Sequence, residues 1–117
     1  MSDDTATVAS LRGRVAEFVR ERAWEPYHRP ANLAKAISVE AAELLELFQW
    51  RETEKMDARM RARVEEELAD VVIYCLSAAN TMAIDLSDAV VRKLRKNESR
   101  YPADEWRGRA RDASHED

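Results

Sequence analysis

The fold of this chain is expected to be organised around residues Ile37–Trp50, which read ISVEAAELLELFQW. This stretch contains no Gly or Pro and is rich in Ala, Leu and Glu, so its local preference is for an α-helix. At 3.6 residues per turn, Glu40 and Glu43 fall on the same face as the apolar Leu44 and Leu47. Because an uncompensated charge on an apolar face is destabilising, this pair predicts a bound cation.

A second stretch that can supply acids to the same cation is Glu65–Tyr74, which reads EEELADVVIY. At helical spacing, Glu67 and Asp70 share a face with Val71 and Tyr74, so this helix also carries two acids on an apolar stripe. If the two helices face each other, they supply four carboxylates to one metal site built only of oxygen donors.

Hard oxygen donors suit Mg²⁺, with Mn²⁺ as a substitute. A di-iron bundle would use Glu-x-x-His, and neither His28 nor His115 stands at that spacing; zinc is disfavoured for the same reason. Mg²⁺ usually completes its shell with water and substrate phosphate, so a polyphosphate is the expected substrate. With no glycine-rich phosphate loop, the phosphates would be held by metal and by Lys93, Asn97 and Arg100, which share one face of the last long helix.

Composition limits the remaining possibilities. At 117 residues, the chain is expected to form one domain over 1–117, with its core at about 8–102 and a polar tail at 103–117. The net charge of −4 and the absence of a basic run argue against nucleic acid as a partner. A single cysteine, no secretory leader and no apolar run near the ~20 residues of a membrane span predict a soluble, cytoplasmic protein without a membrane partner.

Four helices are predicted, each after a residue that can cap its N-terminus. The expected bounds run from Thr5 or Thr7 to about Ala23, from Asn32 to near Trp50, from Asp57 to about Met82, and from Asp85 or Ser87 to just before Pro102. No segment has the period of a strand, so the fold class is all-α, an antiparallel four-helix bundle. The third helix is apolar on nearly every side between Leu68 and Ala79, which predicts burial against another copy of the chain.

Taken in order, these motifs resemble the all-α MazG-like nucleotide pyrophosphohydrolases. The resemblance rests on Glu40-x-x-Glu43, on Glu67-x-x-Asp70, and on the later run Lys93, Asn97, Arg100, Tyr101, Pro102. Residues 24–33, WEPYHRPANL, and 46–50, ELFQW, resemble the dCTP pyrophosphatase branch of that family. The similarity covers roughly Leu11 to Pro102.

The resemblance implies an activity and a set of site residues. In that family the four acids bind Mg²⁺ and water attacks a nucleoside triphosphate, giving the monophosphate and pyrophosphate. The branch implies dCTP or a modified dCTP as substrate, and a homotetramer built as a pair of dimers. The residues expected to contact the substrate are Trp24, Trp50 and Tyr74 around the base, with Lys93, Asn97, Arg100 and Tyr101. At Val15 the chain departs from the branch, which carries a His there.

Other interpretations remain open. One alternative is the same chemistry on dUTP or another non-standard nucleotide. Another is a non-catalytic helical assembly protein whose acids bind a structural cation or pair with arginines. Trp24, Trp50 and Tyr74 are equally typical of core or interface aromatics. Glu46 is close enough to the acids to serve as a base, and His28 is expected to brace its loop rather than to act in catalysis.

Overall fold

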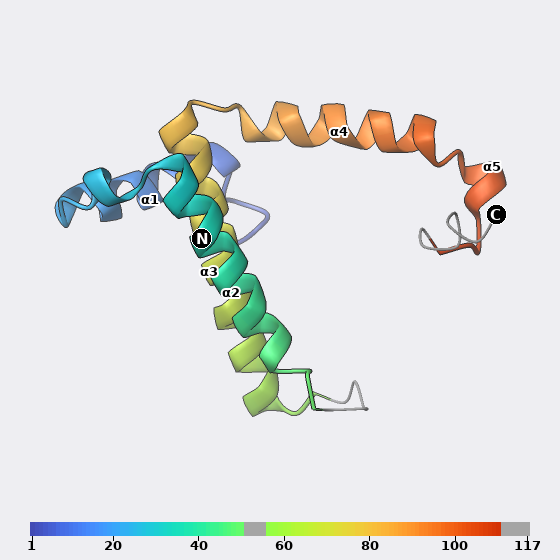
Figure 1. The fold of residues 1–117 in the computed structure, drawn as a ribbon, viewed down its shortest axis with the longest axis horizontal. Coiled ribbons are helices and arrows are strands. Elements are labelled where there is room, and N and C mark those ends of the chain that lie inside the picture. The colour runs from blue at the N-terminus through green and yellow to red at the C-terminus, as the bar shows by residue number, and fades with distance from the viewer. Residues whose placement is uncertain (51–55, 111–117) are drawn as a thin grey trace. The chain divides into compact units, whose positions relative to one another are not determined.

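The computed structural model describes residues 1–50 and 56–110, and every regular element in these ranges is helical (Figure 1). The predicted all-α class is therefore confirmed. The elements are α1 (Val8–Glu21), the short 3₁₀-helix η1 (Glu25–Tyr27), α2 (Pro30–Glu46), α3 (Ala58–Met82), α4 (Leu86–Arg100) and α5 (Ala103–Trp106). The chain divides into two compact units, Met1–Ile84 and Asp85–Asp117.

Three of the predicted N-caps are confirmed. Thr7 accepts a hydrogen bond from the backbone N–H of Ser10 at 3.0 Å, and the Ser10 hydroxyl accepts one from Thr7 at 2.9 Å, which closes a capping box. Asp57 and Asp85 each accept a bond from the N–H three residues later, at 2.8 and 3.1 Å. These bonds satisfy donors that the first helical turn leaves free, so they fix where α1, α3 and α4 begin.

The predicted start and end of the second long helix were wrong. The helix starts at Pro30, before Asn32. The φ angle of a proline is already close to the helical value, and a proline has no backbone N–H that would need a partner in the first turn. The Asn32 amide instead donates to the Tyr27 carbonyl at 3.1 Å and ties η1 to α2. The helix ends at Glu46, and the residues up to Trp50 form turns.

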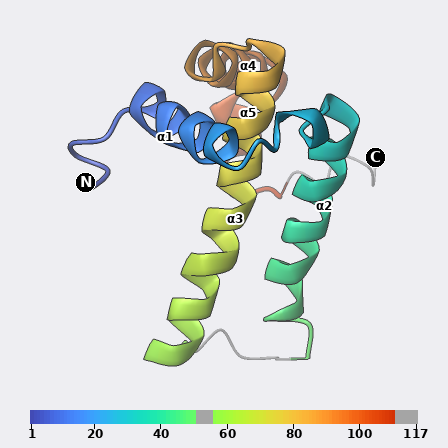
Figure 2. The same cartoon turned by 90° about the vertical axis from the view of Figure 1, so that its left-hand side faces the viewer.

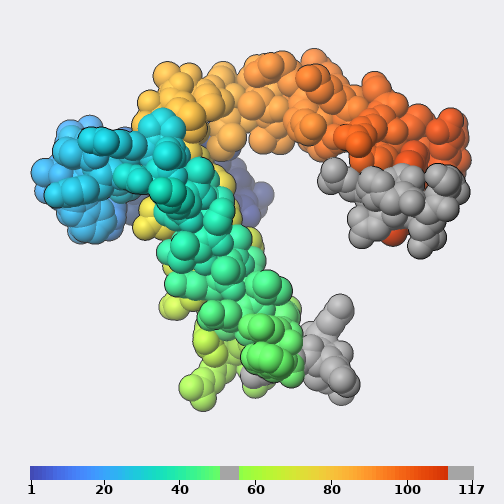
Figure 3. Space-filling model, viewed as in Figure 1, coloured from blue at the N-terminus to red at the C-terminus, as the bar shows by residue number. Residues whose placement is uncertain are grey.

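In the first unit, α2 runs antiparallel to α3, and these two helices make the largest contact between elements (Figure 2). In the space-filling view, atoms of α2 lie over α3, which is visible along its edges (Figure 3). The helix α1 also packs on α3. The buried core consists of Val19, Leu33, Leu47, Met60, Leu76, Ser77, Ala78 and Ala79.

The apolar surface of α3 is only partly covered within one chain. Its C-terminal part is buried, but Leu68, Val72 and Ile73 remain 51%, 44% and 41% exposed. This agrees with the apolar pattern seen in the sequence, whereas burial of these residues against another copy stays a prediction. No single helix in the described ranges is long and apolar enough to cross a membrane; α3 and α4 meet that test only as a broken pair.

The second unit contains α4 and the short helix α5. The tail predicted to begin at residue 103 therefore starts with a helical turn, in which the Trp106 ring packs edge-on against Tyr101 with centroids 4.9 Å apart. The rest of that tail, from residue 111, lies outside the described residues. Because α4 belongs to a different unit from α1, α2 and α3, a four-helix bundle within one protomer stays a prediction.

Candidate metal and substrate site

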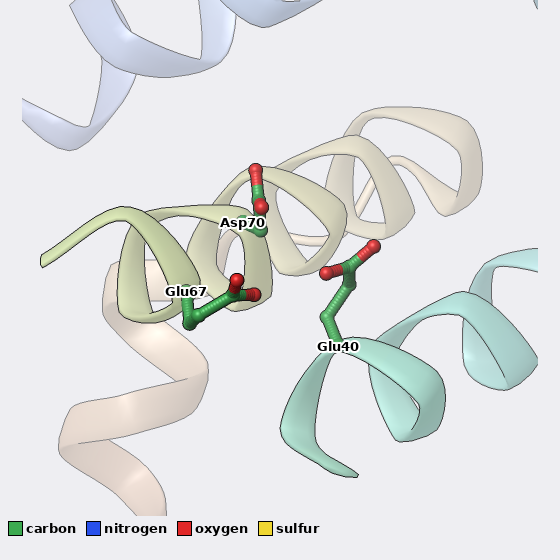
Figure 4. Close-up of side chains that lie close together, drawn as sticks. All are labelled: Glu40, Glu67 and Asp70. Atoms are coloured by element: carbon green, nitrogen blue, oxygen red, sulfur yellow. The ribbon is translucent and has the colours of Figure 1, made fainter. Parts of the chain in front are cut away.

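Three carboxylates converge between α2 and α3. Glu40 on α2 and Glu67 and Asp70 on α3 each place one carboxylate oxygen within 4.8 Å of the others. Figure 4 shows Glu40 reaching from α2 toward the two acids of α3. All three side chains are half-buried. The spacing of the two acids on α3 puts them on one face, and the antiparallel packing brings Glu40 opposite them.

The fourth predicted acid, Glu43, is exposed and lies beside this group. Its carboxyl lies close enough to Glu40 and Glu67 to raise the pKa of both groups. The structure therefore brings three of the four predicted acids within 4.8 Å of one another and places Glu43 near Glu40 and Glu67.

The electrostatics of this cluster are unfavourable without a counter-charge. The hydrogen bond to Glu43, then partial burial, and then the negative charges of Glu43, Asp70 and Glu67 raise the pKa of Glu40 to about 7. Partial burial, followed by Glu43 and the neighbouring charges, also raises the pKa of Glu67. The Oε2 atoms of Glu40 and Glu67 are buried, and neither has a hydrogen-bond partner in the described structure.

Buried and unpaired carboxylate oxygens are costly, and a native protein normally satisfies them. Here the two orphaned oxygens belong to helices that face each other, with further carboxylates beside them. The donor set among the described residues is oxygen only, which fits a hard divalent cation such as Mg²⁺ or Mn²⁺. The cluster is therefore suited to hold a metal ion.

An apolar pocket of about 300 Å³ borders α3 on the C-terminal side of the acid cluster. It brings two of the three predicted base-binding aromatics together, Trp24 from the loop after α1 and Tyr74 from α3. Tyr74 follows Asp70 by one helical turn and so points to the same side of α3. The residues that line the pocket are Arg14, Val15, Phe18, Val19, Trp24, His28, Ile73, Tyr74 and Ser77.

The third predicted aromatic, Trp50, is not part of this pocket. Trp50 is 87% exposed and lines a different hollow of about 410 Å³ with Glu46, Leu47, Gln49, Met60 and Arg63. The structure separates Trp50 because α2 ends at Glu46, and the chain then turns at the far end of the α2–α3 pair. Within one chain, the aromatics therefore lie on both sides of the acid cluster.

His28 braces its loop, as predicted. Its Nδ1 lies 2.9 Å from the Ser77 hydroxyl, and its carbonyl accepts a hydrogen bond from the Thr81 hydroxyl at 3.2 Å. Both partners belong to α3, so the loop that carries Trp24 is fixed to the helix that carries Tyr74. Ser77 was not predicted from the sequence, where its only signal is a small polar residue within the apolar part of α3.

The remaining predicted substrate contacts belong to the second unit. Lys93, Asn97 and Arg100 follow one another at helical spacing on α4, and the Arg100 guanidinium lies 5.4 Å from the centre of the Tyr101 ring. These four residues and the acid cluster belong to different units, so contact of the four with a substrate at the cluster stays a prediction.

Comparison with known proteins gives a consistent set of relatives. The model of the MazG-like family matches residues 35–115. The chain is 41% identical to dCTP pyrophosphatase 1 of Bos taurus over 109 residues, which cover 89% of this chain and 64% of that protein. For the protein of the same name from Homo sapiens, identity is 42% over 102 residues, covering 83% and 60%. The chain thus spans less than two thirds of the length of these curated relatives.

A solved structure shares the fold. The crystal structure of a pyrophosphatase from Archaeoglobus fulgidus DSM 4304 superposes with a TM-score of 0.75 at 40% sequence identity, covering 87% of this chain and 98% of that one. The family model spans more than half of the present chain and includes all four predicted acids. This chain belongs to the MazG-like family.

Proposed function

We propose that this protein is a Mg²⁺-dependent nucleoside triphosphate pyrophosphohydrolase that converts dCTP, or a modified dCTP, to the monophosphate and pyrophosphate. The observation that carries the proposal is the cluster of Glu40, Glu67 and Asp70, in which Glu40 and Glu67 each keep a buried oxygen without a partner among the described residues. The substrate is suggested by the names of the dCTP pyrophosphatase 1 relatives. Mn²⁺ would replace Mg²⁺ at the same oxygen donors.

The residues that would hold the metal are Glu40, Glu43, Glu67 and Asp70. When bound, Mg²⁺ neutralises phosphate charge and makes water more acidic. Four carboxylates exceed what one Mg²⁺ usually takes from a protein, so one of them is left to accept the proton of the attacking water. Glu46, one turn after Glu43 on α2, is the next candidate for this proton transfer.

The base is proposed to stack in the pocket of Trp24 and Tyr74. Stacking on aromatic side chains is worth ~1–3 kcal/mol per base and accepts any ring, so selection by base depends on size and hydrogen bonds. A pocket of about 300 Å³ walled by large side chains favours a single-ring pyrimidine. We expect dCTP and close analogues first, other pyrimidine deoxynucleotides next and purines last. Trp50 would join this pocket only from a neighbouring protomer.

A second candidate keeps the chemistry and changes the substrate to dUTP or another non-standard nucleotide. The observation that favours it is Val15, which lines the base pocket where the dCTP branch carries a His. A valine can neither donate nor accept a hydrogen bond, so this wall of the pocket cannot distinguish the amino group of cytosine from the carbonyl of uracil.

The test is a screen of nucleoside triphosphates for monophosphate and pyrophosphate, with Mg²⁺, with Mn²⁺ and with a chelator. The proposal expects metal-dependent hydrolysis with dCTP or a dCTP analogue as the best substrate. Preference for dUTP would favour the second candidate. Failure of every nucleotide with both metals would leave the non-catalytic assembly protein as the better interpretation.

The assembly is proposed to be a homotetramer of cytoplasmic protomers. The support is the apolar surface that α3 leaves exposed at Leu68, Val72 and Ile73. Light scattering at micromolar concentration should report four copies per particle, and Leu68→Glu should lower that number. A monomer with full activity would contradict the proposal and the contribution of Trp50 from a neighbour.

A further inference from the structure

We propose that Arg63 binds the two outer phosphates of the substrate and holds pyrophosphate as it leaves, so that the nucleotide lies along α3 in one fixed direction. The proposal rests on the pyrophosphohydrolase function above and adds to it a phosphate-binding residue and an orientation. It arises from the order of side chains along a single helix and from the second pocket beside the acid cluster.

The order along α3 is Arg63, Glu67, Asp70, Tyr74. Successive members are separated by about one helical turn of ~5.4 Å, so all four project from the same side of the helix. The two acids occupy the middle. Tyr74 lines the apolar pocket beyond Asp70, and Arg63 lines the other pocket before Glu67. A ligand with a base at one end and phosphates at the other matches this order in one direction only.

The pocket of Arg63 is suited to a small, strongly charged group. It has a volume of about 410 Å³, and the residues around it are Glu46, Gln49 and the exposed ring of Trp50, with the buried Leu47 and Met60. Arg63 is its only cationic side chain among the described residues. A polar hollow of this kind is a poor site for an apolar base, whereas the Trp24–Tyr74 pocket is a good one.

The guanidinium of Arg63 is available to bind a ligand. No hydrogen bond or ion pair joins it to another described residue. Arg61, two positions earlier on the same helix, differs: it forms an ion pair with Glu65 at 3.5 Å and both side chains are exposed. The planar fork of an arginine can bind two phosphate oxygens at once, and such charge-assisted bonds are stronger than neutral ones.

The reaction gives this residue a definite role. A water oxygen forms a bond to the α-phosphorus, and the bond from that phosphorus to the oxygen bridging to the β-phosphorus breaks. The electron pair of the broken bond stays on pyrophosphate, and the proton from water passes to a carboxylate of the cluster. Negative charge therefore develops on the outer phosphates, on the side where Arg63 lies, and a nearby cation stabilises that charge.

Glu46 supplies an internal check on this assignment. It stands on α2 in the same pocket and carries the charge opposite to that of Arg63. If pyrophosphate binds here, Arg63 attracts it and Glu46 repels it. Neutralising one or the other should then change pyrophosphate affinity in opposite directions, which a general loss of folding cannot produce.

The experiment measures binding of inorganic pyrophosphate by calorimetry with Mg²⁺ present, together with product inhibition during dCTP hydrolysis. In Arg63→Met, we expect affinity for pyrophosphate to fall by about tenfold, as for the loss of a charge-assisted bond. Arg63→Lys should recover part of it, and Glu46→Gln should raise it. Arg61→Met is the matched control, with unchanged affinity and activity, and circular dichroism checks that each variant is folded.

Two results would overturn the assignment. Unchanged pyrophosphate affinity in a folded Arg63→Met variant is one. The other is a change in preference among bases without a change in pyrophosphate affinity, which would place the base in this pocket. If the wild-type protein hydrolysed no nucleotide, only the proposed function would be contradicted. The calorimetric comparison of Arg63→Met with Arg61→Met would still decide whether Arg63 binds pyrophosphate.

Discussion

The two halves of α3 differ in whether their buried polar groups have hydrogen-bond partners. Toward the C-terminal end, Ser77 bonds His28 at 2.9 Å, and Asn80 accepts a bond from Arg12 at 3.0 Å and donates one to its carbonyl. Toward the N-terminal end, Glu67 has a buried oxygen with no partner in the described structure, opposite an equally unpaired oxygen of Glu40.

This difference separates stability from function along one helix. Where α3 packs against α1 and the His28 loop, every polar group named above is satisfied, as expected for a structural core. Where it faces α2, mutual repulsion and partial burial work against folding, and only a bound cation would offset them. Mutations in the C-terminal half of α3 should therefore change the stability of the protein, and mutations in its N-terminal half should change the activity.

The largest expected effect is on the acid half. Glu67→Gln keeps the size of the side chain and removes a metal-binding charge, so we expect activity to fall by more than about 100-fold, because even residues that only orient metal ligands cost 10–100-fold. The thermal midpoint of the metal-free protein should not fall, since a repulsive charge has been removed. The measurement is kcat/KM for the best nucleotide beside a melting curve.

Glu65→Gln is the matched control, because Glu65 lies on the same helix and is paired with the exposed Arg61. It should retain its activity. Full activity in Glu67→Gln would mean that the orphaned oxygens have no catalytic role, and the contrast between the two halves would then be only structural.

A smaller effect is expected in the other half. Ser77→Ala removes the hydroxyl next to His28 Nδ1 and leaves a part-buried ring nitrogen unpaired, which should lower the free energy of unfolding by ~1–3 kcal/mol. Ser38→Ala is the control, because Ser38 is exposed and bonds only a carbonyl of its own helix. Denaturant unfolding of both variants measures the difference; equal stabilities would show that the His28–Ser77 bond contributes nothing.

The smallest expected effect is a pH dependence of the metal-free protein. The pKa of Glu40 is about 7 in the folded state and 4.5 when unperturbed, so between these values the folded protein keeps a proton that the unfolded chain has released. Stability should therefore decline as pH rises from about 4.5 to about 7, and it should level off above this range. Melting curves across that range check it.

Two variations of that experiment sharpen it. Glu40→Gln should flatten the decline, because the titrating group is gone. Saturating Mg²⁺ should cancel it, because the metal binds the charged carboxylates of the folded state. A decline that persists in Glu40→Gln would assign it to other groups.

Much of this contrast could be predicted from the sequence, because it depends on short spacings. Helical periodicity alone placed Glu40 with Glu43 and Glu67 with Asp70, and the caps at Thr7, Asp57 and Asp85 set the starts of three helices. A spacing of three or four residues is settled by the geometry of one helix, which tertiary packing seldom changes.

What depends on tertiary placement could not be predicted in the same way. The Trp24–Tyr74 pocket requires the loop after α1 to fold back onto α3, and Trp50 lies elsewhere because α2 ends sooner than its apolar pattern suggests. The helix α2 begins at Pro30 and not after Asn32, because the fixed φ of a proline can start a helix without a side-chain cap. Contact of Lys93 and its neighbours on α4 with the substrate stays a prediction, because α4 and the acid cluster belong to different units.

The antiparallel pairing of α2 with α3 has a mechanical consequence. The carboxylates meet only if the two helices keep one axial position, since a slip of one residue would rotate and shift each acid away from its counterpart. That position is held by apolar side chains away from the acids, among them Leu33, Leu47 and Met60, which are 2%, 7% and 5% exposed. The geometry of a charged centre is thus maintained by hydrocarbon packing, and the shape of these three residues limits how far the helices can slide.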